Sequence, residues 1–219
     1  MLAAARDDQR MQAIRQRAEA LGLSVQPVTN DALVKLIGAV AHQGALASVR
    51  PLPPLDENAL IASLGTLSGD ALLLILDGVT DPHNLGACLR TADAAGAHAL
   101  IIPRDRSASV DGIVRKVAAG AAEFLAVASV TNLARTLDRL KEHGIWVVGT
   151  DQDAAQSIHA VDLKRPLALV LGAEGSGMRR LTRERCDYLV RIPMAGSVGS
   201  LNVSVAAGVA LFEARRQRG

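Results

Sequence analysis

The pattern of apolar positions changes near residue 71 of this chain. From there onward, short uninterrupted apolar runs alternate with segments that have helical spacing. An uninterrupted run is typical of a strand that is buried on both faces, and the alternation is typical of a sheet covered by crossover helices. The sequence therefore predicts an α/β domain with a mostly parallel sheet. The predicted strands are 72–76, 99–102, 124–127, 145–148 and 167–171, and the predicted helices between them are 85–95, 112–121 and 133–143.

The apolar positions before residue 50 predict a second, smaller α/β unit. Helical spacing predicts an amphipathic helix over residues 7–21. Thr29 or Asn30 is expected to cap another helix, and residues 23–28 and 45–49 are expected to form short strands. About fifty residues are few for an independent core, so we expect this α/β module to be incomplete. The expected apolar stripe of the first helix is Met11, Ile14, Ala18 and Leu21.

Three prolines between residues 51 and 54 separate the two patterns. Proline removes a backbone donor and restricts the residue before it, so neither a helix nor a strand should continue through this stretch. We therefore expect a small module at residues 1–50, a linker at 51–69 with a short helix at 57–64, and a main domain at 70–219.

The composition narrows the classes of function. The chain has 219 residues, of which 49% are hydrophobic and 21% are charged, as in an ordinary globular protein. It has only one Trp, one Tyr and two Phe, which argues against nucleic-acid binding by base stacking. The net charge of +2 permits an anionic partner such as RNA without requiring one.

Cysteines and histidines offer no recognisable metal or disulfide framework. The two cysteines, Cys88 and Cys186, lie far apart within apolar patterns, where a cysteine is more often a small core residue than a nucleophile. The five histidines are scattered singly, so a metal site is not expected. No apolar run approaches twenty residues, so we expect a cytoplasmic protein without a membrane span.

The first segment that could carry chemistry runs from Asp77 to Arg90, between a predicted strand and a predicted helix. Open α/β sheets usually bind ligands at such a position. Helical side chains lean toward the N-terminus, so Arg90 should reach over Gly86 and Ala87 to a phosphate or a sugar. The alternative is a solvated Arg90 that pairs with Asp93. The expected buried stripe of this helix is Leu85, Cys88, Leu89 and Ala92.

The second segment, residues 171–180, has three glycines after a predicted strand. Glycines allow the backbone to approach a ligand closely, and Glu174 offers a carboxylate at the end of the strand. The order of the glycines fits neither a dinucleotide fingerprint nor a P-loop. A purely structural glycine turn is the alternative.

The third segment, residues 190–204, runs from a short strand through a loop rich in Pro and Gly into the last helix. Ser200 or Asn202 is expected to open that helix. The reachable backbone N–H groups of such a loop suit a polar small molecule or a phosphate. The alternative is a capped helix after a turn. The expected apolar stripe of the helix is Val205, Val209 and Phe212.

Taken together, the three segments closely resemble the three motifs of SpoU/TrmH-type RNA ribose 2'-O-methyltransferases. The resemblance spans most of residues 71–216, and it is specific because three long motifs occur in the right order and spacing. Within the family, the chain is most similar to the enzymes that methylate a guanosine of bacterial 23S ribosomal RNA. The matching segments are Asp-Pro-His-Asn-Leu-Gly-Ala-Cys-Leu-Arg-Thr-Ala from Asp81, Leu-Gly-Ala-Glu-Gly-Ser-Gly-Met from Leu171, and Ile-Pro-Met-Ala-Gly-Ser-Val-Gly-Ser-Leu-Asn-Val-Ser from Ile192.

The resemblance implies S-adenosylmethionine-dependent 2'-O-methylation of RNA, a trefoil knot at the C-terminal end of the domain, and a homodimer packed around that knot. Ordinary topological rules would not predict the knot. The residues implied to line the cofactor site are Gly172, Ile192, Met194 and Leu201. The residues at the family's catalytic and substrate-binding positions are Asn84, Arg90, Glu174, Ser200 and Asn202.

The same resemblance implies that residues 1–50 belong to a ribosomal-protein-like module that binds RNA. The opening strand and helix of that module are expected to be absent from this chain. We expect this difference to affect RNA affinity and site selection more than methyl transfer.

A mechanism follows as a hypothesis from these positions. A guanidinium with a pKa above about 12 is a poor general base. We therefore expect Arg90 to hold a phosphate and stabilise a developing alkoxide, while Glu174 orders the surrounding loop. Asn84, Ser200 and Asn202 are expected to orient the ribose.

Two other classes of protein are alternatives to this hypothesis. A nucleotide-dependent oxidoreductase would need an early G-x-G-x-x-G, which the sequence lacks. A non-catalytic RNA-binding protein of the same fold would have no reason to retain the loops around Gly172 and Ser200.

Overall fold

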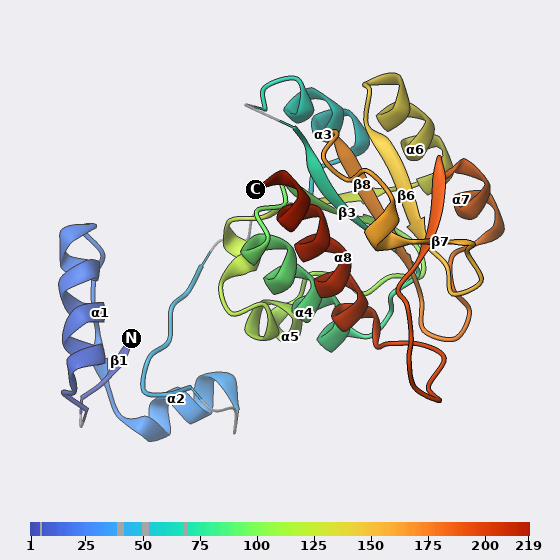
Figure 1. Ribbon diagram of the computed structural model, residues 1–219. Helices are drawn as coiled ribbons and strands as arrows, with labels where there is room; N and C mark the ends of the chain where they lie inside the picture. Colours follow the sequence, from blue (N-terminus) through green and yellow to red (C-terminus); the bar gives the residue numbers. More distant parts are fainter. Residues whose placement is uncertain (5, 39–41, 50–52, 68–69) are drawn as a thin grey trace. The chain divides into compact units, whose positions relative to one another are not determined.

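The computed structural model describes residues 1–4, 6–38, 42–49, 53–67 and 70–219 (Figure 1). The chain forms two compact units, residues 1–51 and residues 52–219, and each is described by itself. Residues 50–52 and 68–69 of the predicted linker lie outside the described residues.

The smaller unit is a short βαβ arrangement followed by a second helix. Strands β1 (Leu2–Ala3) and β2 (Pro27–Val28) pair in parallel, with α1 (Gln9–Ala20) between them and α2 (Asn30–Ile37) after them. Asp8 and Thr29 cap the two helices by accepting hydrogen bonds from backbone N–H groups of the first turns, as short polar side chains do at helix starts.

Several predictions for the smaller unit were wrong. Residues 45–49 form no strand, because only Ala45 makes an isolated bridge, to Leu2. Most of residues 23–28 lie outside β2. Of the apolar stripe predicted for α1, Met11 is buried, whereas Ile14 and Leu21 are exposed. A unit of this size has too little interior to cover a full helical stripe.

The larger unit is built on a seven-stranded sheet in which every pairing is parallel. The order across the sheet is β5-β4-β3-β8-β6-β9-β7. The prediction of an α/β domain with a mostly parallel sheet is therefore confirmed. The strands are β3 (Leu72–Asp77), β4 (Ala99–Pro103), β5 (Ala126–Val130), β6 (Trp146–Thr150), β7 (Gln156–Ser157), β8 (Leu167–Gly172) and β9 (Tyr188–Arg191).

Helices cover both faces of this sheet and bury its central strands (Figure 1). On one face lie α4 (Pro82–Ala94), α5 (Gly112–Val117) and α8 (Val203–Arg218). On the other lie α3 (Glu57–Leu64), α6 (Leu133–Glu142) and α7 (Arg180–Arg185). Successive side chains of a strand point to opposite faces, so Leu74 and Leu76 join one apolar core while Leu73 and Ile75 join the other.

The strand predicted at residues 124–127 begins two residues later than expected. A 3-10 turn (η1, Ala121–Glu123) continues through backbone hydrogen bonds from Phe124 and Leu125 to the carbonyl of Ala121. Phe124 consequently points away from the core, with 84% of its surface exposed. The short elements β7, α7 and a second 3-10 turn (η2, Ile158–Ala160) were not predicted.

The last helix turns a different face to the core from the one predicted. The residues expected to form its apolar stripe include Val205 and Phe212, which are both exposed. Small residues allow α8 to pack closely on α4, and a Cβ on Gly208 would lie 3.6 Å from the Thr91 side chain. The stripe that is actually buried is Val203, Ala207, Ala210, Leu211 and Ala214.

Strand register brings the functional segments to one edge of the sheet. Asp77 lies opposite Gly172 on β8, and Pro103 lies opposite Val130 on β5. Because the strands are parallel, the loops that follow them emerge at the same edge. No helix within the described ranges is long and apolar enough to cross a membrane.

Candidate active site at the carboxyl edge of the sheet

A cavity of about 380 Å³ lies where β6, β8 and β9 end. Three loops contribute to it, namely those after residues 150, 171 and 191. The cavity is lined by all four residues that the sequence assigned to a cofactor site, Gly172, Ile192, Met194 and Leu201. Glu174 and Ser200 of the predicted catalytic set also line it.

Gly172 has no room for a side chain. A Cβ at this position would lie 2.1 Å from the carbonyl carbon of Gly177 and 2.2 Å from the backbone nitrogen of Met178. The loop folds back on the strand because Ala173 and Gly177 exchange backbone hydrogen bonds. Gly177 itself has a φ of +64°, a conformation that favours glycine. The turn therefore has a structural cause, and it also presents backbone groups to the cavity.

Three side chains from distant segments contact one another, namely those of Asn84, Glu174 and Asn202. The Asn202 side-chain amide donates hydrogen bonds to Glu174 Oε1 at 2.6 Å and to Asn84 Oδ1 at 2.9 Å. Glu174 Oε1 also accepts from the Val203 backbone N–H at 3.2 Å and from the Asn84 amide at 3.4 Å. The structure thus brings together three of the five predicted catalytic residues.

Asn202 has no hydrogen-bonding capacity left for a substrate. Its amide is shared between Asn84 and Glu174, and its Oδ1 accepts from both the backbone N–H and the hydroxyl of Ser204. It is also the N-cap of α8, one of the two residues predicted to open that helix. We therefore interpret Asn202 as a residue that fixes its neighbours, which differs from the expectation that it orients a ribose.

Arg90 lies on α4, outside the residues that line the cavity. Its side chain is exposed, and within the described part of the chain it forms no ion pair, so the alternative pairing with Asp93 does not occur. A Cβ on Gly86 would lie 2.7 Å from Val117 and 2.8 Å from the Val114 carbonyl oxygen. This glycine allows α4 and α5 to pack closely.

Sequence reasoning missed two ion pairs beside the cavity. The buried carboxylate of Asp77 accepts from Arg179 Nε at 2.5 Å and from the Arg179 backbone N–H at 2.8 Å, which joins β3 to the start of α7. At the end of β6, a hydrogen bond from Arg183 to Asp151 at 2.6 Å holds the pKa of Asp151 below its ordinary value. Asp77 is the last residue of a buried strand and Asp151 directly follows another, a signal that could have indicated them.

Cys88 is buried in one apolar core, as predicted, and the half-buried Cys186 packs against the other. Burial raises the pKa of Cys88 and of Cys186 to about 12, so both are thiols at neutral pH. Among the described residues, no group of three His, Cys, Asp or Glu side chains is placed to hold a metal ion.

Comparison with known proteins identifies a family for this fold and site. The profile of the SpoU rRNA Methylase family matches residues 71–212. A relative from Ralstonia nicotianae, the 23S rRNA (guanosine-2'-O-)-methyltransferase RlmB, is 57% identical over 216 residues, which are 97% of this chain and 85% of the relative. The protein of the same name from Pseudomonas aeruginosa is 55% identical over 99% of this chain and 87% of its own length.

Solved structures agree with these relatives. The SpoU methyltransferase AviRb from Streptomyces viridochromogenes superposes with a TM-score of 0.77 and 28% identity, over 98% of this chain and 79% of AviRb. Its complex with the cofactor AdoMet superposes with a TM-score of 0.66 and 35% identity, over 70% of this chain and 62% of AviRb. An AdoMet-bound rRNA methyltransferase from Sinorhizobium meliloti gives a TM-score of 0.73 at 25% identity, over 94% of this chain and 77% of that structure.

Proposed function

The chain belongs to the SpoU rRNA methylase family, and from this membership and its site we infer that it is an S-adenosylmethionine-dependent methyltransferase. Its substrate is the 2'-hydroxyl of a guanosine in 23S ribosomal RNA, as the names of its relatives state for those proteins. A ribosomal RNA substrate also supports a cytoplasmic place of action.

The observation that carries this proposal is the meeting of Asn84, Glu174 and Asn202 beside the cavity that contains Gly172 and Leu201. The three motifs lie far apart in the chain, and two of the contacts join residues 118 and 90 positions apart. A site assembled from such distant segments is more specific than any one glycine-rich turn.

The cavity has the features that S-adenosylmethionine requires. It is lined by the apolar side chains of Ile192, Met194 and Leu201, and the turn after Gly172 brings backbone groups close to it. These residues would hold the cofactor, whose sulfonium supplies an activated methyl group when it is bound.

The protein's own residues would position the ribose and assist loss of its proton. The exposed guanidinium of Arg90 can hold the adjacent phosphate and stabilise the developing alkoxide. Asn84 and Ser200 would orient the sugar. Glu174 Oε1 is occupied by its three donors, whereas Oε2 has no hydrogen-bonding partner within the described ranges, which leaves it available to a ribose hydroxyl.

Methyl transfer to 23S ribosomal RNA tests the proposal. Purified protein would be incubated with labelled S-adenosylmethionine and an unmodified 23S transcript, and 2'-O-methylation would then be mapped by nucleotide. The expected result is one modified guanosine. Calorimetry addresses the alternative of a non-catalytic RNA-binding protein, because RNA binding with no heat from S-adenosylmethionine would favour that alternative.

Three further features belong to the same proposal. The chain is expected to form a trefoil knot, supported by the insertion of β8 between β3 and β6 and by the three loops that converge on one cavity. Residues 1–50 are expected to bind RNA, supported by the separate unit at residues 1–51. RNA titrations of the separated segment would test the module.

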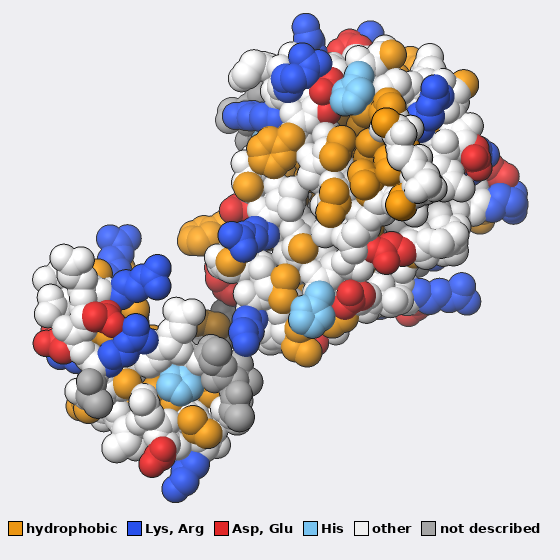
Figure 2. Space-filling model, turned by 60° about the horizontal axis from the view of Figure 1, so that its bottom comes forward, with side chains coloured by type: hydrophobic (Ala, Val, Ile, Leu, Met, Phe, Trp, Pro, Cys, Tyr) orange, Lys and Arg blue, Asp and Glu red, His pale blue; other side chains and the backbone are white. Residues whose placement is uncertain are grey.

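The third feature is a homodimer that uses the exposed side of α8. Hydrophobic side chains gather on the larger unit over the region of α8, with Lys and Arg side chains around them (Figure 2). Val205 and Phe212 of this helix are each about half exposed, at 52% and 51%. An apolar helix face of this kind is typical of a protein interface, and a second copy of the chain would cover it.

A further inference from the structure

A second cavity of about 470 Å³ lies outside the proposed active site. Its walls are mainly polar and come from the start of α3, from α6, and from the ends of β4 and β5. The residues that line it are Asp56, Glu57, Asn58, Arg104, Ser129, Val130, Thr131, Arg135 and Arg139.

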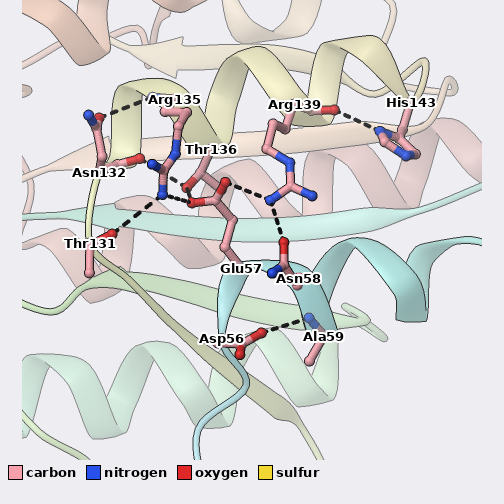
Figure 3. Close-up of polar contacts among 10 residues, drawn as sticks. All are labelled: Asp56, Glu57, Asn58, Ala59, Thr131, Asn132, Arg135, Thr136, Arg139 and His143. Atoms are coloured by element: carbon pink, nitrogen blue, oxygen red, sulfur yellow. Dashed lines mark hydrogen bonds and ion pairs between the residues drawn. The ribbon is translucent and has the colours of Figure 1, made fainter.

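The buried carboxylate of Glu57 holds two of the arginines that line this cavity. Only 8% of Glu57 is exposed, and its two carboxylate oxygens accept hydrogen bonds of 2.8 Å from Arg135 and Arg139 (Figure 3). Thr136 donates a further hydrogen bond at 3.3 Å. Hydrogen bonds from the two arginines oppose the effect of burial and lower the pKa of Glu57, so it remains anionic. The arginines are thereby held in fixed positions.

Positive charge exceeds negative charge around the opening. Glu57 pairs with Arg135 and Arg139, and Asp56, which caps α3 by accepting from the Ala59 backbone N–H, adds a second carboxylate. Arg104 adds a third guanidinium, and its side chain is exposed and makes no hydrogen bond within the described part of the chain. A guanidinium has five N–H donors, so Arg135 and Arg139 retain unused donors beside it.

The cavity lies at the same edge of the sheet as the proposed active site. Arg104 follows β4 and Thr131 follows β5, while Asn84 follows β3, and these three strands are adjacent. Two strand spacings are roughly 10 Å. The loop after β4 also contacts the loop after β3, because Ala108 N–H donates to the Val79 carbonyl at 2.9 Å. A nucleic acid strand bound at one loop would therefore pass the other.

We propose that this cavity binds a backbone phosphate of the RNA substrate, one or two nucleotides from the ribose that is methylated. Fixed arginines with spare donors match the geometry of a phosphate group, and with so few aromatic side chains in the chain, RNA must be held mainly through its backbone. Arg104 makes the direct contact, and Glu57 positions Arg135 and Arg139. This proposal rests on the proposed function.

Replacing Arg104 tests the cavity without disturbing the Glu57 contacts. Lys164→Ala is the matched control, because Lys164 is also an exposed cation and precedes β8 at the opposite edge of the sheet. Binding of a 23S fragment would be measured over a range of salt concentrations. Arg104→Ala is expected to weaken binding about fivefold at low salt and to reduce the salt slope by about 0.7, whereas Lys164→Ala leaves both unchanged.

Kinetics provide the second readout. Arg104→Ala should raise the KM for RNA, with kcat at saturating RNA, affinity for S-adenosylmethionine and Tm all unchanged. The proposal would be overturned if the Arg104 and Lys164 variants had the same RNA affinity, salt slope and KM for RNA. A fall in Tm or in cofactor affinity with Arg104→Ala would also overturn it. If the unaltered protein fails to methylate RNA, the proposed function has failed; if it methylates normally and only the Arg104 effect is missing, the phosphate site alone is wrong.

Discussion

Asn202 and Glu174 are joined by a hydrogen bond of 2.6 Å across 28 residues of sequence. This contact fastens the glycine-rich loop after β8 to the first turn of α8, and Asn84 completes the cluster from the start of α4. One side-chain amide thus links three of the five catalytic positions that the sequence suggested, and its loss should separate them.

Asn202→Ala is expected to lower the single-turnover rate of methylation at least tenfold while costing only about 1 kcal/mol of stability, the usual cost of removing an N-cap. The matched control is Asn132→Ala, which removes the same type of cap from α6. Rapid-quench methylation and urea unfolding would measure both effects. Equal rates for the two variants would show that Asn202 acts only as a cap.

Gly172→Ala is expected to abolish measurable binding of S-adenosylmethionine, because the new methyl group would overlap the backbone of Gly177 and Met178. The loop would have to leave the strand, and the cavity wall would move with it. Gly196→Ala is the control, since a Cβ there meets nothing within 4 Å. Calorimetry would measure the two affinities, and normal binding by the Gly172 variant would contradict the proposed cofactor site.

Arg90→Ala is expected to reduce the rate of methyl transfer about a hundredfold at saturating RNA, the usual scale for loss of a group that stabilises a developing oxyanion. Arg90→Lys should retain part of the rate because it keeps the charge but loses the planar fork. Single-turnover assays separate this effect from RNA affinity. A full rate with Ala at saturating RNA would remove Arg90 from the chemistry.

Stability is expected to fall in acid partly through Glu213. Hydrogen bonds from Arg216, then Gln217 and His159, lower the pKa of Glu213 from 4.5 to about 2. A carboxyl group whose pKa is lower in the folded state stabilises the fold above its unfolded pKa and loses that contribution as pH falls to its folded pKa. The contribution is therefore complete above about pH 5 and lost toward pH 2.

Glu213→Gln should consequently be less stable than the unaltered protein at pH 7, and the difference should shrink between pH 5 and pH 2. Urea unfolding at several pH values would measure it. Glu142→Gln, at an exposed position of α6, should leave the pH dependence unchanged. A constant difference between the Glu213 variant and the unaltered protein across this range would contradict the assignment.

The sheet could be predicted because its strands are buried on both faces and therefore read as uninterrupted apolar runs. The same reasoning failed for α8, where the buried contacts are made by Ala207, Ala210 and Ala214 and the larger Val205 and Phe212 face outward. A prediction from the hydrophobic pattern gives most weight to large apolar side chains, whereas close packing of two helices requires small ones. The proposed dimer would cover the outward face, and the sequence pattern of a single chain does not report such a contact.

The sequence predicted which residues belong to the candidate site, but it did not predict the hydrogen bonds between them. Gly172, Glu174 and Asn202 were named from motifs, but their roles in the fold depend on hydrogen bonds between segments that no local pattern specifies. Asp77 shows the same limit, because its partner Arg179 is 102 residues away and only the strand order brings them together. Loop contacts of this kind follow from the tertiary fold.

The two phenylalanines of the chain offer a matched test of the proposed homodimer. Phe212 lies on the exposed face of α8, whereas Phe124 lies beside η1 and is 84% exposed. Phe212→Glu would place a charge within an apolar interface and should convert the protein to a monomer in sedimentation experiments at micromolar concentration. Phe124→Glu adds the same charge at the more exposed position and should leave the dimer intact. A monomeric unaltered protein would refute the dimer, and dissociation by the Phe124 variant alone would place the interface on another face.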